Sequence, residues 1–321
     1  MKEFLLKYKK HYIKLLIAIL AFIVFLKLIN IKNYSFILKS LSNPLFWLSC
    51  LMLLFVQIIK AFRFQLLISE YDIKISFLRN LLIHLMVPVL GLLTPLKFGE
   101  GAKLIMINQK KKKVGFCFIL EKLMDLGFLF ILGVIGVYRY TIFINSIYLL
   151  IPIIIAAIIG LIYFDRIFNL LFQRFLKSKM ERNWFVSNLL LFAKPRHLIT
   201  FACGILIWVI TINVAYKFSL IAGAEFQNIT FFEFAPVYAS SILVGLFSGI
   251  PGGIGSREAA ISLLFFQVFK IKIVSGGVFS ILNLFGNYLT FIFLGIMSYS
   301  IYKYKFINSR KKKICLEKYK T

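Results

Sequence analysis

Long apolar runs alternate with short polar and basic segments along the whole chain. Most of the runs contain about 17 to 25 residues, the length that an α-helix needs to cross ~30 Å of hydrocarbon. We therefore predict an all-α polytopic membrane protein. Its eight hydrophobic segments are predicted at residues 13–30, 44–68, 78–93, 114–138, 142–163, 198–222, 231–269 and 273–302.

Two of these segments are interrupted in the same way. Segment 78–93 is short and runs into a Pro-x-x-x-Gly motif, and segment 231–269 contains a second copy of that motif. Irregular backbone survives at membrane depth only where protein or a wet cavity surrounds it, so we expect both breaks to lie centrally. The motif residues and the acidic residues that follow them are Pro95, Gly99 and Glu100 in the first break and Pro251, Gly255 and Glu258 in the second.

The charge of the chain lies between the apolar runs. There are 39 Lys and Arg residues against 12 Asp and Glu, which gives a formal net charge of +27. This placement follows the positive-inside rule and does not favour a nucleic-acid partner; contact with anionic lipid is a second explanation. We expect the basic arm 1–13, the run 110–113 and the basic tail 303–321 to face the cytoplasm. The protein would then be a multi-pass protein of the cytoplasmic membrane with both termini inside.

The third segment conflicts with simple crossing. Basic residues flank it on both sides, and both flanks cannot be cytoplasmic if the segment spans the membrane. The conflict disappears if residues 78–108 form a re-entrant hairpin from the cytoplasm and residues 232–269 form another from the opposite side. Six spans and two hairpins result, with Lys270 and Lys272 outside against the charge rule. The alternative is eight full spans, which places the run 110–113 outside.

The two halves of the chain share a further pattern. Each break is followed by a span with two polar residues at i,i+4 spacing, which places them on one helical face: Glu121 with Asp125, and Asn283 with Asn287. We therefore predict an inverted repeat of residues 44–138 and 198–302 within a membrane domain 14–302. Interrupted helices in matching positions of such repeats indicate a central binding site.

The breaks also suggest what this site binds. Helices that restart at about Glu100 and Ser256 would point free N–H groups at an anion, and nearby basic side chains would add full charges. The predicted headgroup-binding residues are Lys97, Gly99, Glu100, Lys103, Glu121, Asp125, Pro251, Gly252, Gly253, Gly255, Arg257, Glu258, Asn283 and Asn287.

Simpler explanations exist for several of these residues. The Pro-Gly breaks could only kink their helices, and Glu258 could only stabilise a helix N-terminus. Glu121 and Asp125 are costly at membrane depth unless they are paired or face a polar interior. Structural salt bridges would satisfy them, and the candidate partners are Arg63, Lys97 and Lys122.

Catalytic and cofactor chemistry has no recognisable pattern in the sequence. There is no Ser-His-Asp, metal-ligand or phosphate-loop motif, and the four cysteines are scattered singly. His84 stands alone in an apolar stretch, where a hydrogen-bonded packing role is a simpler interpretation than a proton relay. We expect no catalytic residue, no metal and no cofactor.

Three motifs together resemble a known family. They are TPLKFGE at 94–100 with Lys103, EKLMD at 121–125 and PGGIGSRE at 251–258. The sequence from about 14 to 302 is similar to the flippase-like transmembrane region of lysylphosphatidylglycerol synthases. The resemblance implies an eight-segment membrane domain with re-entrant elements that moves or shelters lipids. Long members carry a C-terminal synthase domain, whereas this sequence is expected to end in a basic tail without aminoacyl transfer.

Three functions remain open at this point. The first is translocation of an anionic phospholipid or a polyprenyl-phosphate-linked lipid. The second is a non-catalytic role as a membrane partner of envelope-assembly or lipid-synthesis proteins. The third is a membrane-embedded transferase with Glu100, Glu121 or Asp125 as general base. The absence of a nucleotide-binding motif in the sequence disfavours the third, so we predict a protein that is not an enzyme.

Overall fold

The computed structural model describes residues 40–92, 94–140, 187, 197–248 and 250–308. These residues form helices and contain no strand, which confirms the predicted all-α fold. The predicted segments 13–30 and 142–163, the arm 1–13 and most of the tail lie outside the described residues. The elements are α3 (Pro44–Ser69), α4 (Phe77–Leu92), the 3₁₀ turn η1 (Pro95–Ala102), α5 (Lys103–Ile107), α6 (Lys111–Tyr140), α10 (Leu198–Ala222), the 3₁₀ turn η4 (Ala224–Phe226), α11 (Phe231–Phe247), the 3₁₀ turn η5 (Pro251–Gly253), α12 (Ser256–Phe269), α13 (Ile273–Tyr302) and the π-turn η6 (Lys303–Asn308).

Several helices have the length and composition of membrane spans. Among the described residues these are α3, α10 and the stretch Ile273–Phe306 that contains α13. Helices α4 and α11 are apolar but shorter. Outward-facing side chains such as Phe293 and Ile296 of α13 are more than half exposed, as expected of a helix in contact with lipid. The chain is therefore an integral membrane protein.

Local sequence determines where the helices begin. At the start of α3 the Asn43 side chain accepts a hydrogen bond from the backbone N–H of Leu45, and Pro44 occupies the first helical position. At the start of α11 the Glu233 carboxylate accepts hydrogen bonds from the Thr230 backbone N–H and hydroxyl, as part of a capping box. Both caps satisfy donors that the first turn of a helix leaves unpaired.

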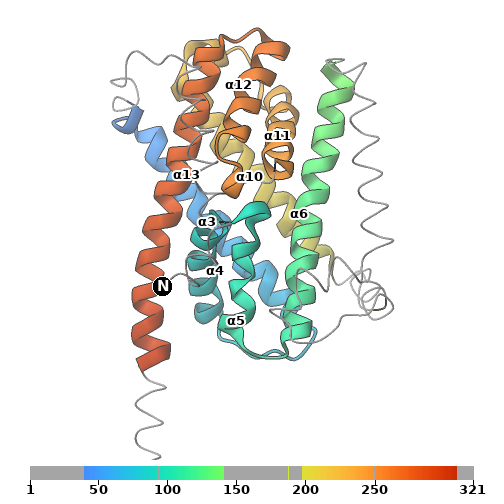
Figure 1. Cartoon of the computed structure of the whole chain (residues 1–321), viewed down its shortest axis with the longest axis vertical. Coiled ribbons are helices and arrows are strands. Elements are labelled where there is room, and N and C mark those ends of the chain that lie inside the picture. Colours follow the sequence, from blue (N-terminus) through green and yellow to red (C-terminus); the bar gives the residue numbers. More distant parts are fainter. Residues whose placement is uncertain (1–39, 93, 141–186, 188–196, 249, 309–321) are drawn as a thin grey trace, which may run out of the picture.

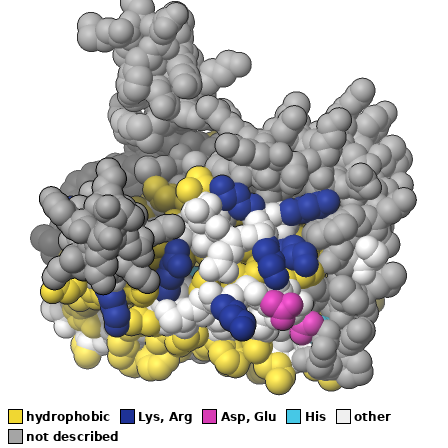
Figure 2. Space-filling view, turned by 90° about the horizontal axis from the view of Figure 1, so that it is seen from below, with side chains coloured by type: hydrophobic (Ala, Val, Ile, Leu, Met, Phe, Trp, Pro, Cys, Tyr) yellow, Lys and Arg dark blue, Asp and Glu magenta, His cyan; other side chains and the backbone are white. Residues whose placement is uncertain are grey.

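One end of the molecule, which we call the basic end, gathers the segments around residues 70–76, 106–113 and 302–308 (Figure 1, bottom). The Lys110 ammonium donates to the Tyr71 carbonyl at 2.6 Å, and the Arg79 guanidinium donates to the Met106 carbonyl at 2.8 Å. Figure 2 shows Lys and Arg side chains gathered on this face. The basic residues of these segments are Lys74, Lys110, Lys111, Lys112, Lys113, Lys303 and Lys305, and Arg79 of α4 joins them.

The opposite end gathers the termini of other helices. The backbone N–H of Lys272 donates to the Glu225 carboxylate at 3.1 Å, and the ring of Tyr140 packs on Phe269 with centroids 5.5 Å apart. Helix α6 therefore runs from the basic end to the opposite end, and α13 runs back. The predicted bounds 114–138, 198–222 and 273–302 agree closely with α6, α10 and α13.

The chain doubles back on itself at both breaks. Helix α4 lies beside η1, where a Cβ added to Gly99 would be 2.0 Å from the Leu90 carbonyl oxygen. Helix α11 lies beside α12, where a Cβ added to Gly245 would be 2.6 Å from the Cβ of Arg257. The two helical hairpins, α4–α5 and α11–α12, start from opposite ends and meet in the middle (Figure 1). Their re-entry into a lipid bilayer stays a prediction.

The order of elements is the same in both halves. Helix α3, the α4–α5 hairpin and α6 correspond in order to α10, the α11–α12 hairpin and α13. Packing is reciprocal as well, because α4 contacts α13 while α11 contacts α6. This order supports the predicted inverted repeat, whose exact boundaries, like those of the domain 14–302, stay a prediction.

The close approach at Gly99 generates the first prediction. We expect Gly99→Ala to lower the free energy of unfolding by about 1–3 kcal/mol. The added methyl group would overlap the Leu90 carbonyl, so the backbone of either α4 or η1 must shift. The measurement is the apparent melting temperature in detergent. Gly127→Ala in α6 is the matched control, since nothing lies within 4 Å of its added Cβ. Equal melting temperatures for the two variants would contradict the tight hairpin.

Candidate functional site

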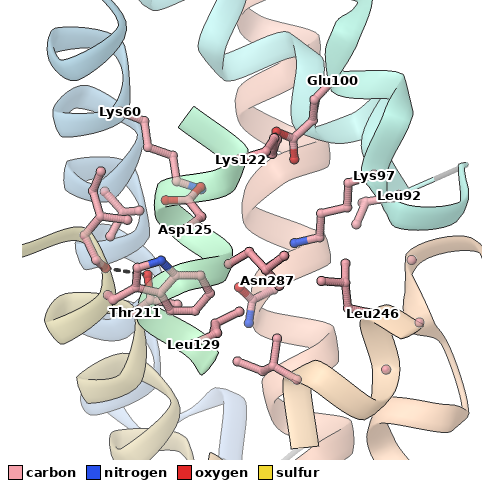
Figure 3. A pocket seen from close by; sticks show the side chains of 18 of the residues that line it. Lys60, Leu92, Lys97, Glu100, Lys122, Asp125, Leu129, Thr211, Leu246 and Asn287 are labelled. Carbon is pink, nitrogen blue, oxygen red and sulfur yellow. Dashed lines mark hydrogen bonds and ion pairs between the residues drawn. The ribbon is translucent and has the colours of Figure 1, made fainter. Parts of the chain in front are cut away.

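A central cavity of about 370 Å³ lies where the two hairpin tips meet (Figure 3). Its walls are mainly apolar and come from α3, α6, α10, α11 and α13. Representative apolar residues are Leu53, Val56, Leu126, Leu129, Ile242 and Phe291. The charged residues that line it are Lys60, Lys97, Glu100, Lys122, Asp125 and Arg257.

A smaller chamber of about 30 Å³ is also lined by Lys60, Lys97 and Glu100, which line the central cavity as well. It is further lined by His84, Lys103 and Glu121. A polar space of this size can hold about one or two water molecules. The central cavity therefore continues into a narrow polar recess.

Arg63 is the centre of a buried ion network between α3 and α6. Its guanidinium lies 2.9 Å from the Asp125 carboxylate and 3.3 Å from the Glu121 carboxylate. The second oxygen of Glu121 lies 2.6 Å from the Lys103 ammonium. Arg63 is fully buried, and Lys103 and Glu121 are only 1% and 2% exposed. The sequence suggested Arg63, Lys97 and Lys122 as partners of Glu121 and Asp125. In the structure Arg63 forms these ion pairs.

His84 and two aromatic rings complete the surroundings of Lys103. The Lys103 ammonium lies 3.3 Å from His84 Nε2 and over the rings of Phe64 and Phe118, at 4.4 and 5.1 Å from their centroids. His84 Nδ1 lies 3.0 Å from the Asn80 carbonyl, which can only accept a hydrogen bond. Nδ1 therefore carries the proton and Nε2 accepts from Lys103. These contacts agree with the packing role expected for His84.

The tip of the first hairpin differs from the prediction. The α-helix expected to restart at Glu100 is wrong, because Pro95–Ala102 forms a 3₁₀ turn and α5 begins only at Lys103. The two glycines in this turn, Gly99 and Gly101, weaken helix formation, and Gly99 allows the close packing on α4. The Glu100 carboxylate instead forms an ion pair with Lys122 of α6.

The tip of the second hairpin contains the predicted helix start. Helix α12 begins at Ser256, and the Gly255 backbone N–H donates to Glu258 Oε2 at 2.6 Å. Arg257 Nε and Nη2 both donate to Glu258 Oε1, at 2.9 and 2.7 Å. Glu258 is fully buried and caps the N-terminus of α12, which is the structural role considered for it from the sequence. This carboxylate, and not an external anion, accepts from Gly255 in the structure.

Two lysines reach into the cavity without an acidic partner. Among the described residues, no carboxylate oxygen lies within 4 Å of the ammonium of Lys60 or Lys97. Figure 3 shows the two side chains pointing into the cavity from α3 and η1. Lys97 adopts a left-handed backbone conformation with φ of 57° at the hairpin tip. Sequence analysis missed Lys60, although a lysine within an apolar run indicates function.

The other predicted residues fall into two groups. Lining the central cavity are Lys97, Glu100, Asp125, Gly252, Gly253, Arg257 and Asn287. The remaining ones do not line it and lie at the tips, at the smaller chamber or behind the cavity wall: Gly99, Lys103, Glu121, Pro251, Gly255, Glu258 and Asn283. The Asn287 side chain donates to Asn283, which in turn donates to the Tyr238 hydroxyl at 3.1 Å.

The described part of the chain contains no candidate metal site. No three His, Cys, Asp or Glu side chains there lie close enough to hold a metal ion. Cys50, Cys117 and Cys203 are free thiols. The polar residues of the cavity can instead bind an anion through lysines or accept and donate hydrogen bonds.

The ion network generates the second prediction. We expect Arg63→Met to lower the free energy of unfolding by about 3–5 kcal/mol, because it leaves the Asp125 carboxylate without its cation and removes one of the two cations that contact Glu121. Thermal unfolding in detergent is the measurement. Lys272→Met is the control, because Lys272 forms an exposed ion pair with Glu225, and such pairs contribute at most about 1 kcal/mol. A melting temperature for Arg63→Met equal to that of the control would show that the network is not structural.

Comparison with known proteins gave one family. Residues 12–294 match the family model described as the lysylphosphatidylglycerol synthase TM region. Searches of curated proteins and of solved structures gave no match.

Proposed function

Because the chain belongs to the family of the lysylphosphatidylglycerol synthase transmembrane region, we propose that it moves an anionic lipid across its membrane. The observation that carries this proposal is the central cavity with apolar walls and two lysines that have no acidic partner. The apolar walls can contact the glycerol and acyl-chain part of a lipid, and the lysines can bind its phosphate. The cargo is an anionic phospholipid or a polyprenyl-phosphate-linked lipid.

The position of the hairpin tips supports a transport path. The headgroup would pass between the tips while its tails stay in the surrounding lipid. The Gly252 backbone N–H donates to the Thr94 carbonyl at 3.5 Å, so the tips touch at the centre. In repeat-built transporters the two halves move about a central site, and these tips would have to separate for the headgroup to pass.

Ion pairing supports transport over transferase chemistry. Glu100, Glu121 and Asp125 are the carboxylates considered as general bases, and each contacts Lys122, Lys103 or Arg63. A carboxylate held by a cation is a poor proton acceptor. We therefore propose that the protein acts on lipids without catalysing a reaction.

The distribution of charge supports an orientation. The basic end would lie in the cytoplasm, together with the arm 1–13 and the tail 303–321, by the positive-inside rule. Both flanks of the α4–α5 hairpin lie at this end, which supports a cytoplasmic position for the run 110–113 as well as for the start of the hairpin. Lys272 lies at the opposite end, where Glu225 is 3.6 Å from its ammonium. We propose the cytoplasmic membrane as the location.

Cysteine labelling tests the orientation, as the third prediction. In a variant whose native cysteines are replaced by serine, we expect Lys74→Cys and Lys111→Cys to react only from the cytoplasmic side. Lys272→Cys should react only from the opposite side, because it lies at the other end of the molecule. The variant without added cysteine is the control for background. Reaction of Lys111→Cys from outside would support eight full spans and contradict the hairpin arrangement.

Translocation in liposomes is the fourth prediction. We expect purified protein to expose labelled phosphatidylglycerol, phosphatidic acid or polyprenyl phosphate of the inner leaflet to an external quencher. Charge reversal by Lys97→Glu should slow this at least about tenfold, because a repelled phosphate loses a charged hydrogen bond. Lys272→Glu, at the exposed opposite end, should retain the rate.

Unchanged accessibility of every lipid, with and without a proton gradient, would overturn the proposed function. A stoichiometric complex with an envelope-assembly or lipid-synthesis protein, insensitive to the cavity charges, would instead support the partner role.

A further inference from the structure

The charges around the cavity do not balance. In the described part of the chain, the central cavity, the smaller chamber and the ion network together contain six basic side chains: Lys60, Arg63, Lys97, Lys103, Lys122 and Arg257. They contain four carboxylates: Glu100, Glu121, Asp125 and Glu258. The site therefore lacks two negative charges.

The surplus positive charge belongs to Lys60 and Lys97. Each of the four carboxylates already contacts a basic partner among Arg63, Lys103, Lys122 and Arg257. Lys60 and Lys97 remain, and both line the central cavity and the smaller chamber. Charged groups inside a membrane protein are costly unless they are paired or solvated, so this pair is well suited to hold an anion.

Two neutral donors in the cavity wall lack a hydrogen-bond partner among the described residues. The indole Nε1 of Trp208 and the hydroxyl of Tyr288 are buried and have no hydrogen-bond partner within the described residues. Both residues line the central cavity. Buried donors are nearly always satisfied, so a small shift of these walls around a bound acceptor group would pair them. A terminal phosphate offers three acceptor oxygens.

We propose that the headgroup bound in this cavity carries two negative charges on phosphate, as a phosphomonoester or a diphosphate does. This inference rests on the proposed function, because it names the cargo of the same cavity. An ordinary phosphodiester supplies one charge and leaves one lysine without a counterion. A lysyl ester of phosphatidylglycerol carries two ammonium groups and one phosphate charge, so the surplus of positive charge repels it.

A pair of matched lipids tests the charge requirement. Phosphatidic acid and phosphatidylmethanol differ by one methyl group, and at about pH 8 the first carries close to two charges and the second carries one. We expect purified protein in detergent to bind phosphatidic acid about tenfold more tightly, because the second charge satisfies the second lysine. Polyprenyl phosphate, with the same phosphomonoester on a different tail, should bind at least as tightly as phosphatidic acid if the cargo is a polyprenyl lipid, and more weakly if it is a phospholipid.

Variants locate the effect at the two lysines. Lys60→Gln and Lys97→Gln should each lower the affinity for phosphatidic acid about tenfold and reduce the preference over phosphatidylmethanol. Lys272→Gln is the matched control and should leave both affinities unchanged. Neither cavity variant should lower the melting temperature without lipid, because neither removes a cation from an ion pair; this separates binding from folding.

The outcomes distinguish this inference from the proposed function. Equal affinity for the two lipids, or a preference that survives both cavity variants, would overturn the dianionic headgroup even if liposome assays show translocation. A strong preference that depends on Lys60 and Lys97 would support it even if no lipid is translocated, in which case the proposed function fails and the binding site stands.

Discussion

The buried guanidinium of Arg63 is the interaction on which the rest of the structure depends. It ties α3 to α6 through Asp125 and Glu121, and Glu121 in turn holds Lys103 at the start of α5. The first hairpin is therefore fixed by a charge network and not by apolar contacts alone. In an apolar surrounding, a network of this kind specifies one arrangement, because any shift that separates its members leaves a charge unpaired.

A second constraint comes from the backbone. The breaks at the hairpin tips expose N–H and C=O groups that lipid cannot satisfy, so the tips must be enclosed by protein. Their enclosure at the centre brings η1 and η5 together and leaves the cavity beside them. The same requirement that buries the tips thus creates the site, and the glycines at the tips allow the close approach that the enclosure needs.

Much of this architecture could be predicted from the sequence, because the length of an apolar run indicates a helix in lipid and basic flanking residues indicate a loop in water. The bounds of α10 and α13 were predicted to the residue, and the two breaks were recognised from Pro and Gly. The helix at Glu100 was wrong because tertiary packing of Gly99 on α4 overrides local propensity. Lys60 was missed because the sequence does not show that it lines a cavity or that no carboxylate lies next to its ammonium. Only the three-dimensional structure shows both.

The contact between the hairpin tips has a consequence for energetics. The hydrogen bond from the Gly252 N–H to the Thr94 carbonyl is long at 3.5 Å, whereas the ion pair of Lys103 with Glu121 behind the tips is short at 2.6 Å. Long hydrogen bonds contribute little free energy. The direct hydrogen bond between the two tips is therefore weaker than the ion pairs behind them, although other helices of the two halves pack closely against each other. A small displacement of one tip relative to the other would therefore cost less free energy than a shift that separates the members of the Arg63 network.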